Sequence, residues 1–130
     1  MKNTRADKPC YCGTEQPYEN CCAAFIEGKQ SAPSAETLMR SRYSAYAQHN
    51  EDYILSTWHA STRPQSLSIN SDSPVKWIRL KVISSSYDTV EFIAWYKHNG
   101  KAHQLHELSR FIFEDQRWYY LDGDTAPTGS

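Results

Sequence analysis

The sequence lacks the features that mark several common classes of protein. No apolar run approaches the roughly 20 residues of a membrane-spanning helix, and no basic-then-apolar leader is present. Lys and Arg together number 14 and Asp and Glu 15, giving a net charge of −1, so no basic field favours nucleic acid as a partner. Gly-rich phosphate loops, nucleophile elbows and paired-carboxylate motifs are also missing. We therefore expect a cytoplasmic protein that is not attached to a membrane.

Cysteine is scarce as well, but all four copies lie in one stretch, Cys10–Cys22, which reads CYCGTEQPYENCC. They form a C-x-C pair followed by an adjacent C-C pair. Zinc takes four such ligands in a tetrahedron, and two ligand pairs on tight turns supply that geometry at low entropic cost. Four thiolates leave no open coordination position, so the metal would be structural. The spacing predicts one structural Zn²⁺ ion held by Cys10, Cys12, Cys21 and Cys22.

A disulfide cluster is the alternative interpretation of these cysteines. Adjacent cysteines such as Cys21 and Cys22 rarely bridge each other because the resulting ring is strained. Both would therefore have to reach Cys10 and Cys12. A chain without a leader offers no oxidising compartment that would favour such bonds. We favour zinc over disulfides and over free thiols.

The segment after the cysteines predicts two helices. Ser34 is placed as an N-cap, and apolar residues then recur at helical spacing as far as His49. Asn50 marks the start of a second helix that ends near His59. Arg42 lies in the middle of the first apolar stripe, where an unpaired guanidinium would cost several kcal/mol. Either a carboxylate or a water-filled cavity faces it, or the helix is rotated and Arg42 snorkels at the rim.

From residue 75 the pattern alternates with a period of two, which predicts antiparallel strands. The expected strands are Val75–Ser84, Asp88–His98, Ala102–Glu114 and Arg117–Asp122. Asn99-Gly100 is a strong hairpin signal. In the first strand we expect Ile78 to face the core with Leu80, and Trp77 to face outward. In the third strand Glu107 and Ser109 share a face with Leu105 and Phe111, which puts the Glu107 carboxylate within reach of Arg42; Asp122 is the other candidate partner.

Several stretches resemble known families. The residues Cys10, Cys12, Gly13, Tyr18, Cys21 and Cys22 resemble the SEC-C motif, also found at the C-terminus of the translocase motor SecA. LMRSRYSAY, STWH, LHELSRF and WYYLDG resemble the YchJ family of bacterial proteins. The resemblance implies that the four cysteines are metal ligands in a module with its linker at residues 1–32. It also implies that residues 33–130 form an α+β domain similar to nuclear transport factor two, with helices packed on a strongly curved antiparallel sheet. Many relatives carry a second SEC-C copy at the C-terminus, whereas no cysteine follows Cys22 here.

One function compatible with these features is protein interaction, with the zinc knuckle as an adaptor. A knuckle joined through a linker would present Tyr11 and Tyr18 to a protein partner. Nucleic acid is a weaker candidate because phosphate contacts need basic charge. On this interpretation, loss of the zinc ligands leaves the main domain folded. Folds of this type also often pair through their sheets, and an exposed Trp77 or Trp95 would mark such a homodimer surface.

The other function is that of a small-molecule binder or enzyme with a polar pocket inside the cone that the strongly curved sheet would form. Ketosteroid isomerase and polyketide cyclases, of similar fold class, place an acid or base there. The candidate lining residues are Arg42, Tyr43, Trp58, His59, Glu107, Ser109 and Asp122, with Glu107 or His59 as the proton-transfer group. The competing interpretation, which we favour, is that Arg42 and Glu107 form a structural ion pair and His59 caps a helix end, with no catalytic role.

Overall fold

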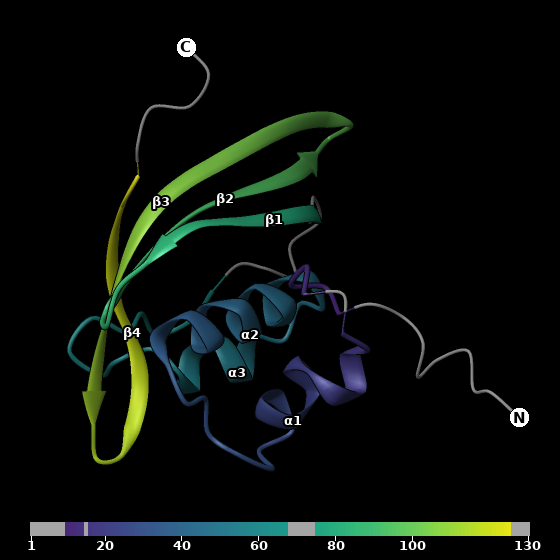
Figure 1. Cartoon of the computed structure of the whole chain (residues 1–130). Coiled ribbons are helices and arrows are strands. Elements are labelled where there is room, and N and C mark those ends of the chain that lie inside the picture. The colour runs from purple at the N-terminus through teal and green to yellow at the C-terminus, as the bar shows by residue number, and fades with distance from the viewer. Residues whose placement is uncertain (1–9, 15, 68–74, 126–130) are drawn as a thin grey trace, which may run out of the picture.

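The computed structural model describes residues 10–14, 16–67 and 75–125. The chain begins with a 3-10 turn, η1 (Tyr18–Asn20), and three helices, α1 (Cys22–Ile26), α2 (Ala35–Ala47) and α3 (Glu51–Ser56). Four strands follow: β1 (Lys76–Ser85), β2 (Thr89–His98), β3 (Lys101–Glu114) and β4 (Arg117–Thr125). They form one antiparallel sheet in the order β1-β2-β3-β4, which curves over α2 and α3 (Figure 1). The predicted α+β fold class, helices on a curved sheet, is confirmed.

Both predicted helix starts are confirmed by their caps. The Ser34 hydroxyl accepts a hydrogen bond from the Thr37 amide, and the Asn50 side chain accepts one from the Tyr53 amide, each at 3.1 Å. Each bond satisfies an amide that the helix itself cannot pair. The second helix ends earlier than predicted because the chain beyond it pairs with β4, where the His59 amide donates to the Tyr120 carbonyl at 2.8 Å. No helix in the described ranges is both long and apolar enough to cross a membrane.

The turn between β2 and β3 is the predicted hairpin. Asn99 and Gly100 have φ angles of 54° and 80°, the pair of positive values that a type I′ turn requires. His98 pairs with Lys101 directly across this turn. The register of β2 against β3 is thereby fixed, which places Phe92 opposite Glu107.

The first strand contains a β-bulge that the alternating pattern does not reveal. Trp77 pairs with Tyr96 and Arg79 with Trp95, so Ile78 is the extra residue. The bulge turns Trp77 toward the inner face of the sheet with Leu80 and leaves Ile78 51% exposed. The predictions that Ile78 faces the core and that Trp77 marks an outer surface were therefore wrong.

The cysteine segment and the sheet share one hydrophobic core. Cys10, Cys12 and Cys22 belong to the same buried cluster as Leu38 of α2 and Leu80 of β1. The packing is therefore continuous between the cysteine segment and the residues that follow, across the predicted boundary between residues 32 and 33.

Candidate functional site

The four cysteines converge on one point. Their sulfur atoms all lie within 4.8 Å of one another, with Cys12 and Cys21 at 3.6 Å and Cys21 and Cys22 at 4.0 Å. A tetrahedron with zinc–sulfur bonds of about 2.3 Å places its sulfurs about 3.8 Å apart, whereas a disulfide bond is about 2.0 Å long. All four cysteines are free, so the disulfide alternative is wrong. This group, the cysteine tetrad, can hold a metal ion.

The surroundings of the cysteine tetrad fit a cation. The Ser44 hydroxyl lies 3.5 Å from the Cys10 sulfur, and the Thr14 hydroxyl lies 3.2 Å from the Cys21 sulfur. Burial raises the pKa of Cys21 to about 11, and negative charge on Cys12 and Cys10 adds to that rise. A metal ion would remove this penalty because it binds the thiolate form. The donor set and its spacing therefore match the chemistry of a closed thiolate site.

Helix α2 forms one wall of the cysteine tetrad. Arg40 donates a hydrogen bond of 2.8 Å to the Cys12 carbonyl, and Ser44 reaches Cys10 from the same helix. Gly13 has a φ angle of 85°, and a β-carbon at this position would lie 3.3 Å from the Leu80 carbonyl oxygen of β1. The turn that carries Cys12 is therefore held between α2 and the sheet.

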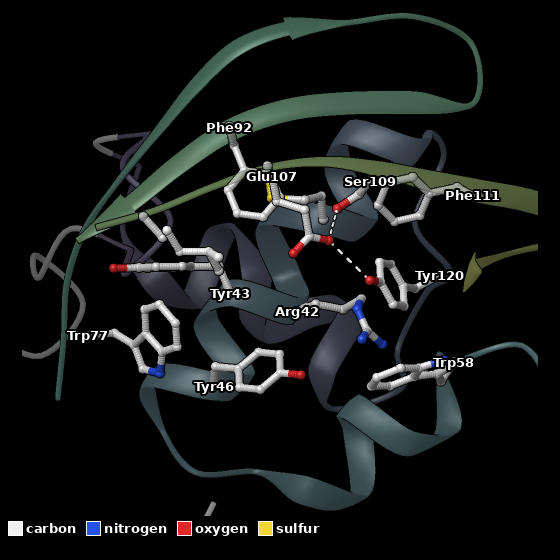
Figure 2. A pocket seen from close by; sticks show the side chains of 13 residues that line it. Arg42, Tyr43, Tyr46, Trp58, Trp77, Phe92, Glu107, Ser109, Phe111 and Tyr120 are labelled. Carbon is white, nitrogen blue, oxygen red and sulfur yellow. Dashed lines mark hydrogen bonds between the residues drawn. The ribbon is translucent and has the colours of Figure 1, made fainter. Parts of the chain in front are cut away.

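A second site lies on the sheet side of α2. It is a cavity of about 250 Å³ between this helix and the inner face of the sheet (Figure 2). An engineered protein cavity of about 150 Å³ holds benzene, so this one has room for a larger, substituted ring. Its lining is mostly aromatic and aliphatic: Met39, Arg42, Tyr43, Tyr46, Trp58, Trp77, Phe92, Ala94, Leu105, Glu107, Ser109, Phe111 and Tyr120.

Arg42 is the most unusual group in this cavity. Its side chain is buried, and the residue is only 6% exposed, so it does not snorkel. Nη1 donates to the Ile54 carbonyl at 2.8 Å and to the Thr57 hydroxyl at 2.7 Å. The guanidinium carbon also lies 5.1 Å from the Trp58 ring centroid and 4.5 Å from that of Tyr120. Burial lowers the Arg42 pKa, but a guanidinium remains charged in proteins.

No carboxylate forms an ion pair with Arg42 among the described residues. The predicted Arg42–Glu107 ion pair is therefore wrong, and the helix is fixed instead by a backbone carbonyl, a hydroxyl and two rings. Glu107 does raise the pKa of Arg42 through its charge, so the two groups interact without contact.

Glu107 is held by its own strand and by β4. Its Oε2 accepts hydrogen bonds from the Ser109 hydroxyl at 2.7 Å and from the Tyr120 hydroxyl at 3.0 Å. Gly123 makes room for this arrangement, since a methyl group there would overlap the Glu107 carboxylate. Burial, followed by the charge of Glu107, raises the pKa of Tyr120, so this phenol stays protonated as a donor. Figure 2 shows the Glu107 carboxylate pointing into the cavity.

Five of the seven predicted pocket residues line the cavity: Arg42, Tyr43, Trp58, Glu107 and Ser109. His59 and Asp122 do not. His59 Nε2 lies 2.8 Å from Glu114 Oε1, and Asp122 accepts a bond from Arg110 Nε at 2.6 Å.

A bulge in β4 explains the position of Asp122. Arg110 pairs with Asp122 and Phe111 with Tyr120, so Leu121 is the extra residue. The bulge turns Tyr120 toward the cavity and Asp122 away from it. Alternation within β4 could not have shown this, because it puts Asp122 on the same face as Tyr120. Tyr120 was not singled out, although alternation from the predicted position of Asp122 placed it in the pocket. Tyr46 lies on α2 one turn after Arg42, within the helical pattern that runs to His49, but it was not among the predicted pocket residues.

Comparisons with known proteins agree with this architecture. Residues 34–123 match the family model described as YchJ, middle NTF2-like domain. A UPF0225 protein of Bordetella pertussis is 46% identical over 95% of this chain and 97% of its own length, and one of Chromobacterium violaceum is 48% identical over 96% and 97%.

Solved structures extend the likeness to the cysteine segment. The solution structure of a SEC-C motif containing protein from Rhodopseudomonas palustris is 33% identical, with a TM-score of 0.80 over 92% of this chain and all of that one. A second SEC-C motif containing protein, from Psychrobacter arcticus, gives 25% identity and a TM-score of 0.71 over 98% of this chain and 88% of that one. With its cysteine tetrad and curved sheet, this chain belongs to the YchJ (UPF0225) family of SEC-C motif proteins.

Proposed function

We propose that the protein binds a small molecule in the cavity under the sheet, and that the cysteine tetrad holds one structural zinc ion. The observation that carries the cavity proposal is Arg42, a buried guanidinium without a carboxylate partner in the described part of the chain. Leaving such a charge without a counter-ion costs several kcal/mol. In a purely structural ion pair the buried charge has its counter-ion within the protein. In a ligand site the charge lacks one until the ligand binds.

The cavity can be tested by filling it. Ala94 is 1% exposed and lines the cavity, whereas Ala102 is exposed on the same sheet. Fluorinated fragments screened by NMR should bind the unmodified protein and the Ala102→Leu variant, and should lose binding in Ala94→Leu. Equal binding to both variants would place the fragments elsewhere and refute the proposal.

Zinc is proposed because four thiolates at this spacing match its tetrahedral preference and leave no position for substrate. Elemental analysis of protein purified without chelator should give one zinc per chain. The four thiols should resist a thiol reagent until the protein is denatured. A protein free of metal, with thiols that react at once, would refute the assignment.

Protein interaction is a second candidate function, favoured by one observation at the surface. Tyr11 is 50% exposed, and its ring centroid lies 5.7 Å from that of Tyr18 in an edge-on contact. The segment that carries this pair also carries the cysteine tetrad, which would make it rigid. A protein is the preferred partner over nucleic acid because the net charge is −1. A Tyr11→Ser variant should lose the partner while keeping its zinc; unchanged capture by this variant would remove this candidate.

A further inference from the structure

The side of Arg42 that the protein leaves unused determines what the cavity can bind. Only Nη1 donates hydrogen bonds to described residues, so the edge formed by Nε and Nη2 is free. No fully buried polar side-chain atom in the described ranges lacks a partner, so Nε and Nη2, which have none there, keep some accessible surface. Arg42 lines the cavity, and we infer that this edge faces it. The Nε–Nη2 edge matches the two oxygens of a carboxylate.

The second charged group of the cavity is Glu107, which meets Arg42 at Tyr120: the tyrosine hydroxyl donates to Glu107, and the Arg42 guanidinium lies 4.5 Å from the tyrosine ring centroid. Glu107 Oε2 takes both hydrogen bonds from Ser109 and Tyr120, which leaves Oε1 without a partner in the described part of the chain. Figure 2 shows the carboxylate directed into the space between Arg42 and Tyr43. The cavity therefore offers a cation and an anion that are not in ion-pair contact with each other.

The remaining walls of the cavity are flat and apolar. Tyr43, Trp77 and Phe92 cover one end of the cavity, and Trp58 lies below Arg42 at the other (Figure 2). Aromatic walls favour an aromatic ligand through edge and face contacts. The Tyr46 hydroxyl points toward the Arg42 end, where it can add a hydrogen bond to a ligand oxygen (Figure 2).

We propose that the ligand is a single-ring aromatic amino carboxylate, bound through its carboxylate to the Nε–Nη2 edge of Arg42 and through its amino group to Oε1 of Glu107. The inference rests on the proposed cavity function and specifies its ligand class. A simple carboxylate would meet Glu107 as a second negative charge, and a simple amine would meet Arg42 as a second positive charge. A zwitterion offers an opposite charge to Arg42 and to Glu107 at once.

A series of four probes with the same phenyl ring tests the contributions of Arg42 and Glu107 without changing the protein. The probes are L-phenylalanine, 3-phenylpropanoate, 2-phenylethylamine and 2-phenylethanol, titrated calorimetrically into the zinc-loaded full chain. A charge-assisted hydrogen bond contributes about tenfold to 100-fold in affinity. L-phenylalanine should therefore bind at least about tenfold more tightly than each of the other three. The indole signal of Trp77 in NMR spectra reports whether a probe occupies the cavity.

A charge-neutral variant tests whether Glu107 binds the amino group of the ligand. Glu107→Gln keeps an oxygen that can accept from Ser109 and Tyr120 but removes the negative charge. It should weaken L-phenylalanine by about tenfold and leave 3-phenylpropanoate unweakened. Glu114→Gln is the matched control, because Glu114 pairs with His59 outside the cavity. This control should bind all four probes as the unmodified protein does.

The outcomes separate the ligand class from the cavity function. If 2-phenylethanol binds as tightly as L-phenylalanine, or Glu107→Gln changes nothing, the amino carboxylate inference is overturned while a cavity binder remains. If none of the four probes shifts Trp77 but fluorinated fragments still bind in the cavity, the inference fails in the same way. If no probe and no fragment enters the cavity, both the inference and the proposed function fail.

Discussion

The cysteine tetrad and the cavity lie on two sides of the same helix, and they differ in how completely their polar groups are satisfied. From α2, Arg40 and Ser44 contact the tetrad, while Arg42 and Tyr46 line the cavity. The tetrad gathers its four sulfurs within 4.8 Å, a closed set for one ion. The cavity instead keeps part of a buried guanidinium and part of a carboxylate unused.

This difference distinguishes the tetrad, as a site that stabilises the fold, from the cavity, as a site with polar groups left for a ligand. Interiors normally pair their buried charges, because an unpaired one loses its hydration without compensation. Arg42 and Glu107 line the same cavity and still do not pair directly, since each is held by other groups. Substitutions in the tetrad should therefore act mainly on stability, and substitutions in the cavity mainly on binding.

The largest expected effect comes from removing tetrad ligands. In Cys10→Ser/Cys12→Ser the metal should be lost, and a structural zinc ion contributes about 10–16 kcal/mol to small zinc modules. Cys10 and Cys12 share a buried cluster with Leu38 and Leu80, so we expect the whole chain to lose several kcal/mol rather than the N-terminal segment alone. Thermal unfolding by calorimetry and the NMR spectrum of the cavity residues measure this.

The matched control for the tetrad variant is Tyr11→Ser, in the same segment but with a half-exposed side chain. It should unfold within a few degrees of the unmodified protein. If the double cysteine variant also keeps its unfolding temperature, the main domain folds without the tetrad, as the sequence-based expectation of a module on a linker would have it.

The cysteine tetrad and the cavity also differ in how far they could be predicted from the sequence. The tetrad is local: four ligands within one short stretch have a recognisable spacing, and the structure brings all four together. The helix caps at Ser34 and Asn50 and the turn at Asn99-Gly100 are equally local, and all were predicted.

The cavity depends on distant contacts and was predicted only in part. Alternation placed Glu107 and Ser109 on the inner face, but the bulges at Ile78 and Leu121 leave no mark in a period-two pattern. Each bulge breaks the alternation between the residues on its two sides, so Trp77 shares the inner face with Leu80 and Asp122 lies on the face opposite Tyr120. The pairing of Arg42 with the end of α3 could not be predicted, because it depends on how two helices pack.

A smaller but more selective effect is expected at Gly123. In Gly123→Ala the new methyl group would overlap the Glu107 carboxylate, a flexible side chain that can move aside without disturbing β4. The displaced carboxylate would lose its bonds to Ser109 and Tyr120, at about 1–3 kcal/mol. Binding of fragments that contact Glu107 should fall in parallel. Urea unfolding and NMR titration measure the two effects.

A double-mutant cycle shows whether the Gly123 effect passes through Glu107. In a Glu107→Ala background the added methyl group has nothing to displace, so Gly123→Ala should cost less than about 0.5 kcal/mol. Full additivity of the two substitutions would contradict the proposed role of Gly123 as the residue that makes room for the carboxylate.

Alkaline pH should weaken the cavity region through Tyr120. Its folded pKa is raised by burial above the ordinary value of 10.0, so its contribution to stability is complete below pH 10 and is lost as the pH rises through the folded pKa. Tyr120→Phe should lose about 0.5–1.5 kcal/mol at neutral pH with the hydrogen bond to Glu107. The free energy of unfolding of Tyr120→Phe should also fall less steeply above pH 10 than that of the unmodified protein. Urea unfolding at a series of pH values measures this, with Tyr87→Phe, 74% exposed, as the control.

The smallest effect on stability is expected on the outer face of the sheet, away from both sites. Leu108 is 39% exposed there, on the side opposite Glu107, and Trp95 on the same face is covered by Arg79 at 4.2 Å. Leu108→Lys, whose cross-strand neighbours are Glu91 and Asp124, should change the free energy of unfolding by about 0.5 kcal/mol or less, and should leave zinc content and cavity binding unchanged. If the protein pairs through its sheet, as its fold class leads us to expect, light scattering should show a dimer that this variant converts to a monomer. A monomeric mass for the unmodified protein would rule out the dimer through the sheet.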